Sequence, residues 1–121
     1  MANKIVLVTK VGGGTINLQE AHINLMQVSG SGAVIRYRAV GGDEKLVVVT
    51  EAASAIETAA ERIFPVTDLV TASLLYLHAD KVVSFSDVNS KAKIIVSDGA
   101  NTVTYMVNET SAAVKVLINA L

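Results

Sequence analysis

The sequence lacks cysteine and tryptophan, and its 121 residues include one proline, two phenylalanines and three tyrosines. The absence of cysteine excludes disulfides, thiolate nucleophiles and cysteine-based metal sites. The net charge of −1 and the pI of about 6.1 provide no bulk attraction for nucleic acid. No apolar run approaches the roughly 20 residues of a membrane helix, and the apolar start is too short for a signal peptide. We therefore expect a cytoplasmic, intracellular protein without a membrane segment.

Hydrophobic residues are plentiful, at 51% of the chain with a mean hydropathy of +0.49. A domain of this size leaves much of its surface exposed, so such a composition needs extra cover. Two destinations suit the surplus: sheet faces packed against helices, and a subunit interface. We predict both, and hence a homo-oligomer.

A shift of 57 positions aligns the sequence with itself. Ser54-Ala55 then falls on Ser111-Ala112, and Gly42 falls on Gly99. Such self-similarity is typical of an internal repeat. We predict one domain, residues 1–121, built of two repeats at about 1–64 and 65–121 and related by a pseudo-two-fold axis.

The first repeat combines two periodicities. Residues 33–39 alternate between apolar and polar, which predicts a strand with one buried face. Apolar residues between 51 and 63 recur at three- and four-residue steps, which predicts a helix of about 13 residues with Thr50 as N-cap. Pro65 would lie just beyond its end. The further strands expected here are 4–11, 15–19, 22–28 and 45–50.

The second repeat predicts strands within 67–77 and at 81–86, 91–97 and 102–107. A final helix is expected from Thr110 or Ser111 to the C-terminus. Because strands run in groups before each helix, the fold class is α+β with antiparallel meanders.

Each half resembles the small FlbD family of flagellar proteins. In the first half the resemblance is carried by Val11-Gly12-Gly13-Gly14, Gly41-Gly42 and Thr50-Glu51. In the second half it is carried by Asp98-Gly99 and Asn108-Glu109. The tandem of meander plus helix is also similar to the PC4/Whirly group, which implies paired sheets that bind single-stranded nucleic acid.

Residues able to support catalysis are sparse. The glycine clusters lead into strands, whereas a phosphate-binding loop leads into a helix N-terminus. The histidines, His22 and His78, have no acidic partner on the same face of a predicted strand. We predict no enzyme activity, catalytic residue, cofactor or metal site.

Two basic pairs are the most suggestive polar residues. Arg36 and Arg38 lie on one predicted strand and Lys91 and Lys93 on another, and the 57-residue shift matches Arg36 with Lys93. They form either a stripe that follows a phosphate backbone or an ordinary exposed sheet face. The acidic pI and the few aromatic residues count against the stripe.

The C-terminal helix is apolar on more than one side. Val114, Leu117, Ile118 and Leu121 fit either core burial or a subunit interface. The sequence predicts a small non-enzymatic binding or structural module, homo-oligomeric and of phage or bacterial accessory type. The alternative is a single-stranded DNA- or RNA-binding protein of PC4/Whirly-like architecture.

Overall fold

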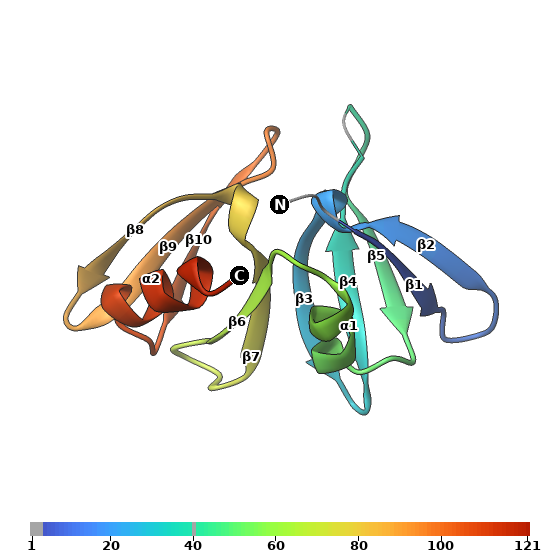
Figure 1. Ribbon diagram of the computed structural model, residues 1–121, viewed down its shortest axis with the longest axis horizontal. Helices are drawn as coiled ribbons and strands as arrows, with labels where there is room; N and C mark the ends of the chain where they lie inside the picture. The colour runs from blue at the N-terminus through green and yellow to red at the C-terminus, as the bar shows by residue number, and fades with distance from the viewer. Residues whose placement is uncertain (1–3, 40) are drawn as a thin grey trace.

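The computed structural model describes residues 4–39 and 41–121, which form three antiparallel sheets and two α-helices (Figure 1). The first group of elements is β1 (Ile5–Thr9), β2 (Thr15–Gln19), the 3-10 turn η1 (Glu20–His22), β3 (Ile23–Ser29), β4 (Gly32–Tyr37), β5 (Lys45–Val49) and α1 (Ala53–Ala59). The second is β6 (Ile63–Thr67), β7 (Leu74–His78), η2 (Ala79–Lys81), β8 (Val82–Val88), β9 (Lys91–Ser97), β10 (Thr102–Val107) and α2 (Ser111–Asn119). The α+β class is confirmed.

We call residues 5–59 the first half and residues 63–119 the second half. The hairpin β1–β2 belongs to the first half, and the meander β8–β9–β10 belongs to the second. The five-stranded sheet has the order β5-β4-β3-β7-β6 and contains strands of both halves. The pairing of β3 with β7 therefore connects the two halves.

Hydrogen bonds of the same kind recur in both halves at a spacing of 58 residues. The Thr9 N–H donates to the Glu51 carboxylate (2.8 Å), and the Thr67 N–H donates to the Glu109 carboxylate (2.9 Å). Bridges at the ends of β1 and β6, Lys10 with Val49 and Asp68 with Val107, follow the same spacing. In β3 and β8 the spacing is 59, because the β6–β7 connection is one residue longer than the β1–β2 connection. Both values exceed the 57 residues of the sequence alignment.

The first helix is shorter than the sequence predicts. The expected helix spans 51–63, whereas α1 spans Ala53–Ala59. Its N-cap is Ala52 and not Thr50, because Glu51 binds the Thr9 N–H across the fold. Pro65 does not follow the helix but lies inside β6, the edge strand of its sheet, where a missing N–H is tolerated.

The second helix and the strands before it agree closely with the sequence. α2 begins at Ser111, and the Oγ1 of its N-cap Thr110 accepts from the Ala113 N–H (3.2 Å). β9 and β10 have the predicted bounds. The expected strand region 67–77 is replaced by two strands, β6 and β7, with a turn between them.

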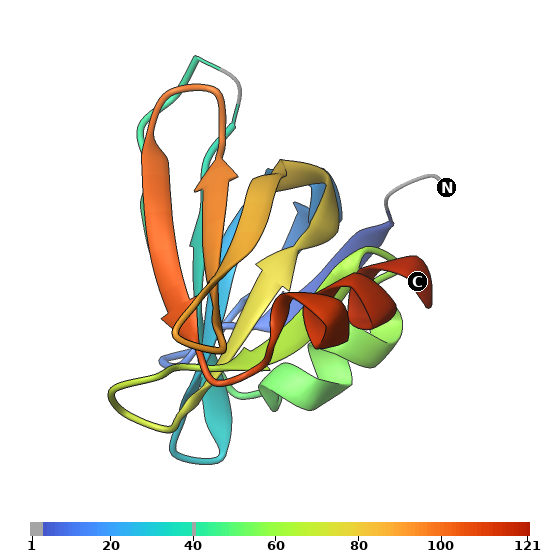
Figure 2. The same cartoon turned by 90° about the vertical axis from the view of Figure 1, so that its left-hand side faces the viewer.

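The core has two clusters, one in each half. α1 contacts β3 and β4, and α2 contacts β6, β8 and β9. Both helices lie on the same face of the molecule (Figure 2). Three buried residues cross between the halves: Ile63 and Tyr76 pack in the first cluster, and Leu25 packs in the second. The halves thus share their cores.

Candidate functional site

The contact of β3 with β7, together with the side chains around it, is termed the joint. The two strands are antiparallel, with Leu25 opposite Leu77 and Met26 opposite Tyr76. Residues 74–77 of β7 are all apolar, and consecutive residues 75–78 are buried, so both faces of the strand are covered. The joint is therefore a continuous sheet with apolar cover.

One face of the β6–β7 hairpin is buried against the first half. Ile63 and Tyr76 are 2% and 3% exposed and pack in the same cluster as Met26 and Ile56. At about 25 cal/mol for each Å² of apolar surface removed from water, side chains of this size stabilise the joint by roughly 2 kcal/mol each.

A buried carboxylate lies at one end of the joint. Glu20 is 0% exposed and accepts backbone N–H groups from Lys4 (3.1 Å), Glu61 (2.9 Å) and Arg62. These donors precede β1 and β6, so one side chain holds the starts of both halves. Its second neighbour is His78, whose Nε2 lies 3.8 Å from a Glu20 oxygen.

His78 is 1% exposed, and its burial lowers the pKa of the imidazole below the ordinary value. The Asp80 N–H donates to Nδ1 at 3.1 Å. Nδ1 is therefore an acceptor, and we assign the proton of the neutral ring to Nε2, which is directed at Glu20.

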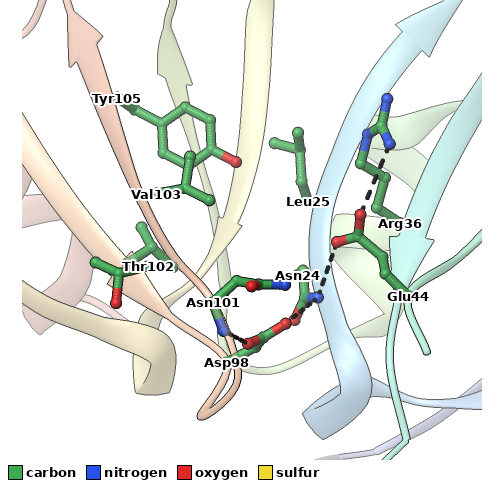
Figure 3. Close-up of a pocket in the computed structure, with 10 residues that line it drawn as sticks. Asn24, Leu25, Arg36, Glu44, Asp98, Asn101, Thr102, Val103 and Tyr105 are labelled. Carbon is green, nitrogen blue, oxygen red and sulfur yellow. Dashed lines mark hydrogen bonds and ion pairs between the residues drawn. The ribbon is translucent and has the colours of Figure 1, made fainter. Parts of the chain in front are cut away.

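A pocket of about 340 Å³ opens beside the joint (Figure 3). Asn24, Leu25 and Arg36 of the first half line one side. Val103 and Tyr105 of the second half line the other side. Its wall combines an apolar surface with a few hydrogen-bonding groups.

Polar groups bridge the halves at the rim of this pocket. Asp98 Oδ2 accepts from Arg38 Nε (2.8 Å) and from Asn24 Nδ2 (3.1 Å). Its other oxygen accepts the backbone N–H groups of Ala100 and Asn101. These backbone hydrogen bonds, with Arg38, lower the pKa of Asp98 to about 2. The bridge is therefore ionised at neutral pH.

The four predicted nucleic-acid-binding residues lie in different environments. Arg36 lines the pocket and is 3.8 Å from Glu44, and Arg38 is paired with Asp98. Lys91 and Lys93 lie on β9, on the face opposite the buried Ile94. Since Tyr105 lies opposite Ile94 in register and lines the pocket, the lysines face away from it. The arginines and the lysines therefore do not form one stripe.

The predicted interface residues of α2 differ in exposure. Val114 is 0% exposed in the core of the second half, and Leu117 and Ile118 pack against the same core. Leu121 is 39% exposed. Among these four residues, Leu121 is the one with substantial free surface.

Residues 4–39 and 41–121 contain no group of three or more histidine, aspartate or glutamate side chains arranged to hold a metal ion. In the same part of the chain, no helix is long and apolar enough to cross a membrane. His22 is partly buried at the end of η1, and His78 belongs to the joint. Sequence reasoning missed the Glu20–His78 contact, because these residues carry no motif and are 58 positions apart.

Among the outer strands of the described sheets, β2 pairs with β1 alone and β8 with β9 alone, and we call these two the open edges. The other outer strands are joined in pairs at their ends, β1 with β5 by the Lys10–Val49 bridge and β6 with β10 by the Asp68–Val107 bridge. Large apolar side chains are exposed beside the open edges, namely Ile5 (64%) and Leu7 (58%) on β1 and Val83 (65%) on β8. The open edges lie at opposite ends of the molecule (Figure 1). In the sequence, the surplus of apolar residues and the strands rich in β-branched residues are the features that indicate such exposed edges.

The joint, its pocket and the two open edges are the features that could serve a function. Comparisons with protein-family models, with curated proteins and with solved structures find no match to this chain.

Proposed function

We propose that this chain is a non-enzymatic structural module that associates with copies of itself. The observation that carries the proposal is the exposure of Ile5, Leu7 and Val83 beside sheet edges that lack a partner in the described residues. Open apolar edges attract further strands, and natural monomers usually protect them. Association would satisfy the edge hydrogen bonds and cover the apolar side chains together.

We further propose that the halves are tandem repeats. The matched bonds of Glu51 and Glu109 and the identical order of elements support this. The pairing favours a head-to-tail relation over the predicted pseudo-two-fold axis, because a two-fold would pair β2 with β8 as β3 pairs with β7. An experimental structure in which residues 5–59 and 63–119 superpose would support the repeat, and failure to superpose would exclude it.

Light scattering over a range of protein concentrations tests self-association. We expect a mass that is a multiple of the 12.7 kDa chain mass and that rises with concentration where assembly is incomplete. A mass of 12.7 kDa up to millimolar concentration would exclude the proposal. The pH should stay near neutral, where the Arg38–Asp98 bridge is charged.

Single-stranded nucleic-acid binding is not favoured as a second function. A phosphate-binding stripe needs cations free to replace counterions. Arg38 is only 14% exposed and is paired with Asp98, and Arg36 is close to Glu44. The resemblance to the FlbD family and to the PC4/Whirly group stays a prediction.

A further inference from the structure

We propose that β8 of one copy pairs antiparallel with β2 of a second copy, in the register that β3 and β7 use within the chain. This inference deepens the self-association proposed above and rests on it. The open edge of β8 thus binds the open edge of β2 in a second copy, and the open edge of β2 binds β8 of a second copy. The contact would repeat the joint between chains.

The two open edges are the counterparts of the two strands in the joint. At the spacing of 59 residues, β8 corresponds to β3 and β2 corresponds to β7. β3 and β8 also carry the same bulge, between Ile23 and Leu25 in one and between Val82 and Ser84 in the other. The bulge does not prevent β3 from pairing with β7. The register then places Ser84, Phe85 and Ser86 opposite Leu18, Asn17 and Ile16 of the second copy.

Residues of β1 and β2 are more exposed than the matched residues of β6 and β7, as expected if β2 lacks a partner strand. Ile63 is 2% exposed because the first half covers it, whereas its counterpart Ile5 is 64% exposed. Tyr76 is buried at 3% exposure, and its counterpart Asn17 is exposed. A second copy seated on β2 would cover Ile5 as the first half covers Ile63.

The surface that would receive Ile5 is present in the second half. Ile63 packs in the cluster of Met26 and Ile56. The counterparts of these two residues are Phe85, which is partly buried, and Val114, which is buried in the second core. Phe85 is therefore the apolar side chain of β8 that remains open to contact Ile5, since Val114 is already 0% exposed within one chain.

Residue types at the β8 edge suit a protein strand. The joint has Asn24 and Arg36 at its pocket, and their counterparts at the open edge are Val83 and Ile95. Neither 82–88 nor 15–19 contains lysine or proline, the residues that usually protect an edge. The edge strand β6, by contrast, contains Pro65.

The pairing is heterologous, since it joins two different edges. Such contacts close into a ring or extend into a filament, depending on the rotation between neighbours. The open edges lie at opposite ends of the molecule (Figure 1), so both can be occupied at once. Each copy would then have one neighbour on β2 and one on β8.

Two variants, each blocked at one edge, test this arrangement. Ile5→Lys places a charge beside β2, and Val83→Lys places one on β8; both side chains are largely exposed, so both variants should fold. Each variant alone should have the mass of one chain by light scattering. An equimolar mixture should have twice that mass, because β8 of one variant and β2 of the other remain intact.

The control is Val70→Lys, at a valine that is 88% exposed in the β6–β7 turn, which should keep the wild-type mass. If either single variant dimerises by itself, the contact joins like edges and the head-to-tail pairing is wrong. A mixture that stays at one chain mass also overturns it. In both cases a multimeric wild type would leave self-association standing, whereas a monomeric wild type would exclude both proposals.

Discussion

Ile63 and Ile5 begin β6 and β1, which the proposed repeat matches with each other, yet they are 2% and 64% exposed. The strand interiors are alike, because Val66 and Val8 are both buried. The difference is confined to the face that meets another half: the first half covers β6, while the corresponding face of β1 has no cover among the described residues. Burial at these positions is therefore decided by the neighbouring unit and not by residue type.

Other contacts are the same in both halves. Glu51 holds the end of β1 and Glu109 holds the end of β6, through N–H groups of Thr9 and Thr67. The hydrogen bond from Thr9 lowers the pKa of Glu51 below its ordinary value. Each half thus has its own internal clamp, independent of the joint.

The largest difference in stability should come from placing lysine at each of these two isoleucines, which the proposed repeat matches. Ile63→Lys buries an unpaired charge and should cost about 4 kcal/mol of unfolding free energy or abolish folding. Ile5→Lys should change it by less than about 0.5 kcal/mol. Urea unfolding measures the unfolding free energy of both lysine variants. Both should carry Val83→Lys in addition, so that assembly does not contribute to stability. Equal losses would contradict the assignment of the joint.

Removal of the Glu20 carboxylate should come next. Glu20→Ala removes the buried acceptor of three backbone N–H groups and should cost about 3 kcal/mol. The control is Glu61→Gln, which removes an ion pair with the exposed Lys4 (3.4 Å) and should cost less than about 1 kcal/mol. Urea midpoints compare the two variants. A loss for Glu20→Ala as small as that of the control would show that the buried contact stabilises little.

Loss of either clamp should destabilise the protein. Glu51→Gln and Glu109→Gln should each cost about 1–2 kcal/mol, because a charged acceptor becomes neutral. The Glu109 variant should lose more, since the Thr67 hydroxyl also donates to that carboxylate (2.9 Å). Thermal unfolding of the two variants measures the loss of stability in each. A large loss in one variant and none in the other would argue against equivalent halves.

A smaller, pH-dependent effect should come from His78, which has no histidine counterpart in the first half. Its folded pKa lies below the unfolded value near 6.5, so below that pH the unfolded chain binds a proton that the folded chain resists. Stability should therefore fall as the pH drops below about 6.5 and should be steady above it. His78→Gln, which copies Gln19, should flatten this slope in urea unfolding between pH 5 and 8. An unchanged slope would show that another group causes the pH dependence of stability.

The smallest expected effect concerns nucleic acid. Fluorescence polarization with labelled oligo-dT of about 30 nucleotides at low salt should show no binding at tens of micromolar protein, because Arg36 and Arg38 have acidic neighbours. Arg36→Ala should leave this result unchanged. Salt-sensitive binding that Arg36→Ala weakens would restore the nucleic-acid alternative.

Much of the fold follows from local patterns in the sequence. Alternation gives β9 its bounds, and Thr110 marks the start of α2 as an N-cap. The predicted helix over 51–63 was too long, because its period continues into residues that the joint recruits for β6. Helical periodicity in a short segment gave way to tertiary pairing.

The candidate site was less accessible from sequence. Glu20 and His78 meet because β7 pairs with β3, and no local pattern encodes that pairing. Arg36 and Arg38 were identified as the polar residues of interest, but their acidic partners depend on how the halves pack. Long-range contacts decide both features.

Amide hydrogen exchange tests most directly whether the open edges pair between chains. In that case β8 of one copy pairs with β2 of another, as β3 pairs with β7 within one chain. Wild-type protein should be compared with the Ile5→Lys, Val83→Lys double variant at equal concentration. Amides in 15–19 and 82–88 should exchange more slowly in the wild type, while those in β3 and β7 should exchange equally in both proteins. Equal exchange of residues 15–19 and 82–88 in the two proteins would contradict this pairing between chains.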